Sequence, residues 1–267
     1  MANTAPEFTL ASPPDETMEF EQPLSERMRT FLRIEFLYQQ ALFHARDLND
    51  FSARAAVATL LEILAILGRG DVRSEVLKEL ERHAALLANY SRQRGVDFER
   101  VQLLIDKVET RRSALAADGP KFINSVKECE FLNMIKHRSS IPGGTCMFDL
   151  PDYAYWLRLP LSERTAQFDD WTRGLRAVCD AVTEVLWLTR QASEPTEQIA
   201  TGGMFQYHME RNEQPTLLRV IVPPDAGTFP EISAGKHRFT VRFVIWEGID
   251  ARPTQVVDDI PFLLALC

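Results

Sequence analysis

The chain has 267 residues, of which 45% are hydrophobic and 25% charged, and its formal net charge is −8. This length suffices for one large domain or two modest ones, and the composition is typical of soluble globular proteins with a sizeable core. No run approaches the roughly 18 to 20 apolar residues that a membrane span needs. The N-terminus lacks the basic start and apolar stretch of a secretory signal. The acidic balance disfavours generic nucleic-acid binding.

Cysteines and histidines give no sign of a metal or redox site. Four cysteines lie far apart, at Cys129, Cys146, Cys179 and Cys267. None forms a Cys-x-x-Cys pair, so a reducing cytoplasm fits this chain best. The five histidines are scattered, and no zinc-protease, nucleophile-elbow, Walker or dinucleotide-binding motif occurs. The missing motifs do not exclude an enzyme, but they leave no positive reason to expect one, and a zinc site or redox motif is not indicated.

The N-terminal region is predicted to contain a tail and then one short strand. Residues 1–16 are rich in proline, threonine, serine and alanine, which predicts a disordered tail. Residues 17–22 follow, and there apolar and acidic residues alternate as in a strand. Because an isolated strand is not stable, we expect this one to pair with a sheet formed elsewhere in the chain.

The stretch from Pro23 to Ala45 is predicted to be a helix with two functions. Apolar residues recur along it at spacings of three and four, which indicates a face packed against a core. Ser25 is the candidate N-cap. Arg29 and Arg33 lie four residues apart and so project from one side of the helix, where two guanidinium groups could bind an anion. The alternative is a solvated surface face.

Five further helices are predicted from the apolar periodicity and the turn residues between them. They run over 51–67 with Asn49 or Asp50 as the cap, from Asp71 to about Arg94, from Asp97 to about Ala117, from about Lys121 to Arg138, and from Arg173 to Arg190. Gly68 suits the left-handed position that ends the first of these. Short turns between long helices indicate antiparallel neighbours, so residues 23–193 are expected to form a helical bundle.

The periodicity changes from helical to strand-like at about residue 194. Glycines and prolines there divide short β-rich runs. In one run, alternation places Arg238 and Arg242 on one face of a strand and three apolar residues on the other. That predicts a buried inner face and a cationic outer face, although a half-buried strand with a fortuitously basic outer face is the alternative. The predicted fold class is α+β, with the helical bundle, a mostly antiparallel sheet domain over 194–267, and the strand 17–22 joining that sheet.

Three long stretches of the chain carry a resemblance to a known family. They are PLSERMRTFLRIEFL, GRGDVRSEVLKEL and SIPGGTCMFDLPDYAYWLRLP. Together with the strand AGKHRFTVRF and the cysteine-ended C-terminus, they resemble the ZapD family of bacterial cell division proteins, which associate with FtsZ. The resemblance extends from about Phe20 to Cys267. Departures from the family pattern are a longer tail before Phe20, and Glu130 and Ala154 where some relatives carry a basic residue and a histidine.

The resemblance implies a cytoplasmic homodimer at the mid-cell division ring, without catalysis or cofactor. It implies that the protein binds the C-terminal tail of FtsZ and, as a dimer, crosslinks and bundles FtsZ protofilaments to stabilise the Z-ring. Basic residues of the family form the tail-binding patch. Carried over by matching motif, these are Arg33, Arg69, Arg238 and Arg242. Position in the same motifs adds Arg29, Arg73, Lys136, Arg138 and Lys236.

Two other classes of function remain as alternatives. A nucleic-acid or nucleotide-binding module could use the same basic strand, with Phe239, Val241 and Phe243 as stacking groups. Alternation places these residues on the core side, and the net charge is unfavourable for such a ligand. A small-molecule enzyme could hold its site in a cleft between bundle and sheet, but no residue pattern supports one.

Overall fold

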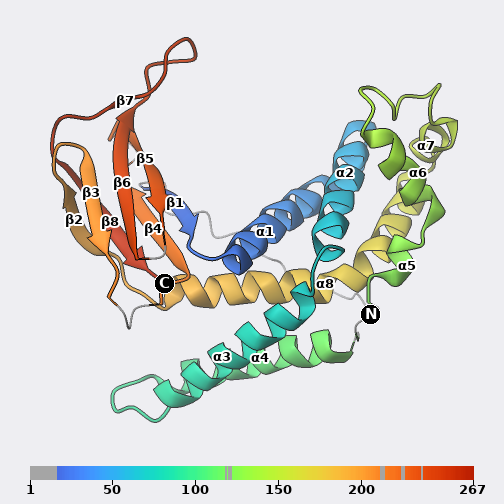
Figure 1. The fold of residues 1–267 in the computed structure, drawn as a ribbon. Helices are drawn as coiled ribbons and strands as arrows, with labels where there is room; N and C mark the ends of the chain where they lie inside the picture. The colour runs from blue at the N-terminus through green and yellow to red at the C-terminus, as the bar shows by residue number, and fades with distance from the viewer. Residues whose placement is uncertain (1–16, 118, 120–121, 211–213, 224–225, 236) are drawn as a thin grey trace. The chain divides into compact units, whose positions relative to one another are not determined.

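The structure is a computed structural model, which describes residues 17–117, 119, 122–210, 214–223, 226–235 and 237–267 (Figure 1). The chain divides into two compact units, which are described separately here. The helical unit is Arg29–Leu188, and the sheet unit combines Thr189–Cys267 with the residues up to Met28. The predicted α+β class is confirmed. The predicted disordered tail, residues 1–16, lies outside the described residues.

The helices account for the first two thirds of the chain. They are α1 (Glu26–Ala45), α2 (Asp50–Leu67), α3 (Val72–Tyr90), α4 (Phe98–Ala117), α5 (Asn124–Lys127), α6 (Glu130–Ser139), α7 (Pro151–Trp156) and α8 (Leu161–Gln191). Fully buried side chains such as Phe31, Leu60 and Val182 form the core of the helical unit. No single helix in the described part of the chain is long and apolar enough to cross a membrane; α2 and α3 would qualify only as a pair, which is bent by 79°.

The three N-caps predicted from local sequence are confirmed. Ser25, Asn49 and Asp71 each accept a hydrogen bond through a side-chain oxygen from a backbone N–H three residues further on, at 3.1–3.2 Å. Hydrogen bonding to Ser74 holds the pKa of the Asp71 carboxyl below its usual value. Each cap satisfies a donor that the helix itself leaves unpaired, and such a cap contributes about 1 kcal/mol.

Three helix predictions were wrong in detail. Gly68 has φ −81° and ψ −17°, which is right-handed, because its N–H still bonds back to Leu64 and Ile66 as in a helical turn. The predicted helix up to Arg138 is interrupted at Cys129, whose ψ of 108° is extended, so that α5 and α6 are separate. The last helix begins at Leu161, well before the predicted start. At the break between α5 and α6, the side chain of Asn133 bonds the Lys127 carbonyl, which local periodicity does not encode.

The sheet unit contains two antiparallel sheets. Its strands are β1 (Met18–Pro23), β2 (Thr196–Ala200), β3 (Met204–His208), β4 (Leu217–Val222), β5 (Thr228–Ala234), β6 (Arg238–Ile245), β7 (Thr254–Gln255) and β8 (Ile260–Leu266). The first sheet has the order β1-β4-β8-β2, and the second has β3-β6-β5 with β7 also paired to β6. The N-terminal strand joins the sheet as predicted, because β1 pairs antiparallel with β4 along its whole length.

Both sheets contribute side chains to one apolar core. The predicted inner face of β6 is confirmed, since Phe239, Val241 and Phe243 are at most 1% exposed. They cluster with residues of the other sheet, namely Leu218, Val220, Val222, Phe262 and Leu264. Burial of this face leaves Arg238 and Arg242 on the exposed side of the same strand. The pleat of β6 therefore holds two guanidinium groups outward by burying the aromatic residues between them.

Candidate functional site

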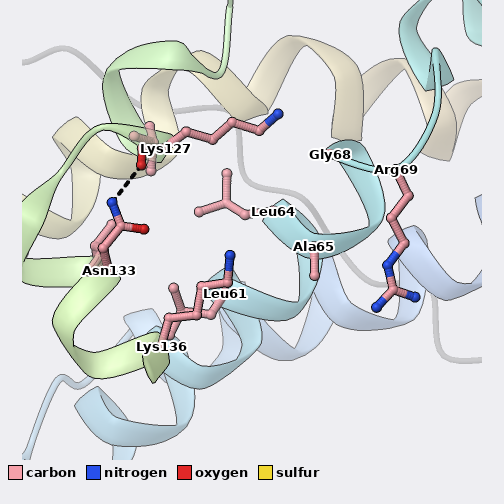
Figure 2. Close-up of a pocket in the computed structure, with 10 residues that line it drawn as sticks. Leu61, Leu64, Ala65, Gly68, Arg69, Lys127, Asn133 and Lys136 are labelled. Carbon is pink, nitrogen blue, oxygen red and sulfur yellow. Dashed lines mark hydrogen bonds between the residues drawn. The ribbon is translucent and has the colours of Figure 1, made fainter. Parts of the chain in front are cut away.

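A groove on the helical unit has a volume of about 470 Å³ and is lined by α2, α5 and α6 (Figure 2). Its apolar lining includes Leu61, Leu64 and Leu132, and its cationic lining comprises Arg69, Lys127 and Lys136. The three cationic residues are exposed, whereas Leu64 and Leu132 are buried. We call this site the α2–α6 groove. It presents positive charge around an apolar floor.

The break between α5 and α6 determines where Lys127 lies. Lys127 is the last residue of α5, and Cys129 then takes an extended conformation before α6 begins. The side-chain amide of Asn133 donates a hydrogen bond to the Lys127 carbonyl, with Nδ2 and O 2.7 Å apart (Figure 2). This carbonyl would otherwise need a helical partner further along the chain. The bond therefore stabilises the break and keeps Lys127 at the groove.

Lys127 approaches the C-terminal end of α2 beside Gly68. A Cβ atom placed on Gly68 would lie 3.5 Å from Cε and Nζ of Lys127 and 3.1 Å from the Leu64 carbonyl oxygen. The ammonium group thus lies near the last carbonyls of α2, where the helix dipole favours a cation.

A second groove, of about 380 Å³, adjoins the first along α2. It is lined by Arg33 and Phe36 from α1 and by Glu62 and Arg69 from α2, among others. Ala65 and Arg69 line both grooves, so the two are neighbours along this face of α2. The structure thus brings together Arg33 and Arg69, which are distant in sequence. We call this site the α1–α2 groove.

The cations of the two grooves are not engaged in ion pairs within the described part of the chain, although Glu62 also lines the α1–α2 groove. Arg33, Arg69, Lys127 and Lys136 form no ion pair with any other residue that the structure describes. Carboxylates, in contrast, hold several other cations of the helical unit, such as Lys107 on Glu184 and Arg111 on Asp180. On a protein of net charge −8, this cluster of cations, none of which has a described ion-pair partner, has the chemistry to attract an anionic group.

Other predicted residues of the helical unit have structural partners. Arg73 donates hydrogen bonds to the carbonyls of Leu115 and Ala116, at 3.0 and 3.2 Å, and so caps the end of α4. Arg138 lies 4.0 Å from Asp149 and is about half exposed. Arg29 is partly buried and has interactions of its own within the protein. None of these three lines either groove.

The sheet unit presents the other predicted basic residues. Arg238 and Arg242 are exposed on β6, and the register places His208 opposite Arg238 and Glu231 opposite Arg242. Arg242 forms an ion pair with Glu231, and both side chains are about half exposed. Lys236 lies outside the described residues. The outer face of β6 therefore offers one arginine beside a histidine and one that is already paired.

Two residues of these surfaces were missed by sequence reasoning. Lys127 lies in a segment predicted to be one continuous helix, and nothing local indicates that it faces α2. His208 could have been found, because alternation along β3 places it on the same exposed face as Met204. That His208 lies opposite Arg238 could not be predicted, because the sequence does not specify that β3 pairs with β6.

The strongly shifted pKa values belong to buried or partly buried side chains outside the two grooves. Burial raises the pKa of Tyr38 and of Cys179, lowers that of His83 to about 4, and raises that of Tyr153 to about 12. None of these residues lines the two grooves. Among the described residues, no group of three or more His, Cys, Asp or Glu side chains could hold a metal ion. The grooves offer cations and apolar surface, which is the chemistry of binding.

Comparison with known proteins identifies the family. The family model of ZapD, described as a cell division protein, matches residues 32–242. The chain belongs to the ZapD family. Relatives named cell division protein ZapD from Methylococcus capsulatus, Escherichia coli and Shigella boydii are each 36% identical over 248 residues. The match covers 93% of this chain and 97–98% of each relative. The predicted recognition of the family is confirmed.

Family membership supports a role for the chain in cell division. The three ZapD relatives are named as cell division proteins, and none of the three is named as an enzyme. The matched region of the family model includes both grooves of the helical unit and the whole basic face of β6. The basic surfaces described above thus lie on the part of the chain that the ZapD family shares.

Proposed function

We propose that this ZapD-family protein is a non-enzymatic factor that binds the C-terminal tail of FtsZ. As a homodimer it crosslinks and bundles FtsZ protofilaments, and it acts in the cytoplasm at the mid-cell division ring. The observation that carries this proposal is the group of unpaired cations lining the two adjoining grooves, Arg33, Arg69, Lys127 and Lys136. The ZapD relatives support the cell division context.

The chemistry of these residues suits an acidic peptide. A guanidinium group can bind a carboxylate through two parallel hydrogen bonds, so Arg33 and Arg69 provide direction as well as charge. Each exposed contact is weak in water and is screened by salt. Several such contacts on one surface add up and accelerate encounter with an oppositely charged partner.

A dimer would strengthen this weak binding on a polymer. An FtsZ filament displays one tail per subunit, and a two-fold protein offers one binding surface per protomer. Once the first surface is bound, the second binding event is intramolecular and takes place at a high effective concentration. If the two surfaces reach different filaments, the same contacts crosslink them. Bundling therefore requires a dimer, whereas tail binding requires only one protomer.

The exposed face of β6, on the sheet unit, is a second proposed tail-binding surface. Arg238 is exposed beside His208, and Arg242 would have to exchange Glu231 for a carboxylate of the ligand. The nucleic-acid alternative loses its stacking groups, because Phe239, Val241 and Phe243 are buried in the core. The exposed face of the strand therefore offers its arginines, which can contact anionic groups.

The test is fluorescence anisotropy of a labelled FtsZ C-terminal tail peptide at low and raised salt. The double variant Arg33→Glu/Arg69→Glu is compared with Arg94→Glu, an equivalent charge change at an exposed turn outside both grooves. We expect saturable binding that weakens with salt, a loss of at least about tenfold in the double variant and little change in the control. Unaltered binding by the folded double variant would contradict the site.

Bundling is tested separately with polymerised FtsZ. Light scattering and low-speed sedimentation should rise when the wild-type protein is added and should not rise with the Arg33→Glu/Arg69→Glu variant. Sedimentation equilibrium of both proteins checks that each is a dimer. If the peptide does not bind at either salt concentration while the protein is folded and dimeric, the proposed partner is wrong.

A further inference from the structure

We propose that the α2–α6 groove recognises a single apolar side chain next to a carboxylate in an acidic peptide, and that Lys127 binds this carboxylate. The inference rests on the proposed function and adds a determinant of specificity to it. The groove would select ligands that carry an apolar side chain next to a negative charge, because it combines an apolar floor with cationic side chains.

The apolar floor is the first observation behind this inference. Leu61, Leu64 and Leu132 line the groove, and Leu61 is only partly buried, so apolar surface faces the open volume. A ligand that contributed only charged groups would leave this surface in contact with water. Burying a leucine-sized side chain there strengthens binding by a factor on the order of ten or more. The volume of about 470 Å³ accommodates such a side chain together with the backbone that carries it.

The arrangement of the cations around this floor is the second observation. Figure 2 shows the side chains of Lys127 and Lys136 extending over the groove from α5 and α6, with Leu64 between them. Neither lysine has an ion-pair partner among the described residues. A carboxylate adjacent to the buried anchor would therefore lie within reach of an ammonium group. The lysine stems also extend the apolar wall, because their methylene groups lie along it.

The fixed position of Lys127 is the third observation. Its carbonyl is held by Asn133, and its ammonium group lies beside Gly68 at the end of α2. The bond from Asn133 fixes the backbone from which the Lys127 side chain extends. The exposed ammonium group therefore starts from a defined point beside the apolar floor of the groove.

The test uses two designed peptides of equal charge. In one, a single leucine stands between acidic residues; in the other, serine replaces the leucine. Binding is measured by anisotropy at low salt and at raised salt, where charge contacts are screened. We expect the leucine peptide to bind about tenfold more tightly than the serine peptide to the wild-type protein at raised salt. Equal affinities would overturn the inference.

Two protein variants separate the contribution of the apolar floor to binding from that of the positive charge. Leu61→Ser should reduce the leucine-to-serine affinity ratio to about two or less, whereas Leu103→Ser, at a 69% exposed site on α4, should leave it unchanged. Lys127→Glu should weaken both peptides by at least about fivefold at low salt and keep the ratio, with Arg94→Glu as its charge control. Circular dichroism confirms folding. If neither Leu61→Ser nor Lys127→Glu changes peptide binding, the assignment is wrong.

A parallel titration with the FtsZ tail peptide separates the two proposals. If the tail binds but is insensitive to Leu61→Ser and Lys127→Glu, the inference about the groove is wrong and the proposed function stands. If the designed leucine peptide behaves as expected while the tail does not bind, the groove is a receptor for another acidic partner and the proposed function is wrong. If neither the FtsZ tail peptide nor the designed leucine peptide binds, the proposed function and the inference about the groove are both wrong.

Discussion

Asn133 donates a hydrogen bond from its side-chain amide to the carbonyl of Lys127, across the break between α5 and α6. One residue of α6 thereby fixes the end of α5 and, with it, the cation that lies over the α2–α6 groove. In a continuous helix, Lys127 and Lys136 would project in directions about 180° apart, because each residue turns the helix by about 100°, whereas here both line one groove. The break is therefore a feature of the site as well as of the fold.

We predict that Asn133→Ala weakens tail binding by a few fold and lowers the free energy of unfolding by about 1 kcal/mol, the usual value of one such bond. The Lys127 carbonyl would lose its partner, and Lys127 would no longer be held at the groove. Urea denaturation and anisotropy measure the two effects. Asn89→Ala, at an exposed position on α3, is the matched control. Equal behaviour of the two variants would show that the bond does not position Lys127.

We predict that Gly68→Ala changes tail binding by less than about twofold and costs little stability. The backbone at Gly68 is right-handed and accepts alanine. The added methyl group would lie 3.5 Å from Lys127 Nζ, which is an ordinary van der Waals contact that leaves this side chain in place. Gly70→Ala is the control, because a Cβ there meets nothing within 4 Å. The measurement is anisotropy, and a much weaker affinity of Gly68→Ala than of Gly70→Ala would contradict the prediction.

We predict that Glu231→Gln strengthens tail binding by about two- to threefold at low salt. Glu231 occupies Arg242 on the outer face of the sheet, so its neutralisation removes an internal competitor for the ligand carboxylate. Both side chains are about half exposed, so the effect on stability should be small. Thermal unfolding serves as the check on stability. Weaker binding by this variant would mean that Glu231 orients Arg242 for the ligand.

We predict that charge reversal on β6 weakens tail binding, in contrast to the neutralisation of Glu231. Arg238→Glu/Arg242→Glu should reduce tail affinity at low salt by at least about tenfold and leave fold and dimer intact, since both side chains are exposed. Sedimentation equilibrium and circular dichroism monitor dimer and fold, while anisotropy measures binding. A folded, dimeric double variant that binds as the wild type would exclude this strand from the tail-binding surface.

We predict that acid destabilises the protein in part through His83. Burial is the main cause that lowers the pKa of His83 to about 4, with the nearby Arg82 also lowering it and Glu79 raising it. The unfolded chain, with a histidine pKa of about 6.5, takes up this proton first, so stability falls as the pH decreases from about 6.5 to 4. His83→Leu should flatten this part of the urea-measured pH profile. An unchanged slope would show that carboxylates alone account for the acid sensitivity.

Local chemistry by itself determined several features of this protein. The caps Ser25, Asn49 and Asp71 were predictable because a side-chain oxygen bonds a backbone N–H only three residues away. The exposed face of β6 was predictable because a pleated strand alternates its side chains whatever it pairs with. The family was also recognisable in the chain itself, and with it the expectation that basic residues form the binding surface.

Tertiary structure alone decided which contacts those basic residues make. Arg73 is a helix cap, Arg242 is paired with a carboxylate, and Arg33 meets Arg69 only because α1 packs beside α2 at one groove. Lys127 lines the other groove from the break between α5 and α6, where the Asn133 side chain holds its carbonyl. These outcomes depend on strand register, helix packing and side-chain bonds between segments. Periodicity along the chain carries no information about them, because it records only which face of each element is buried.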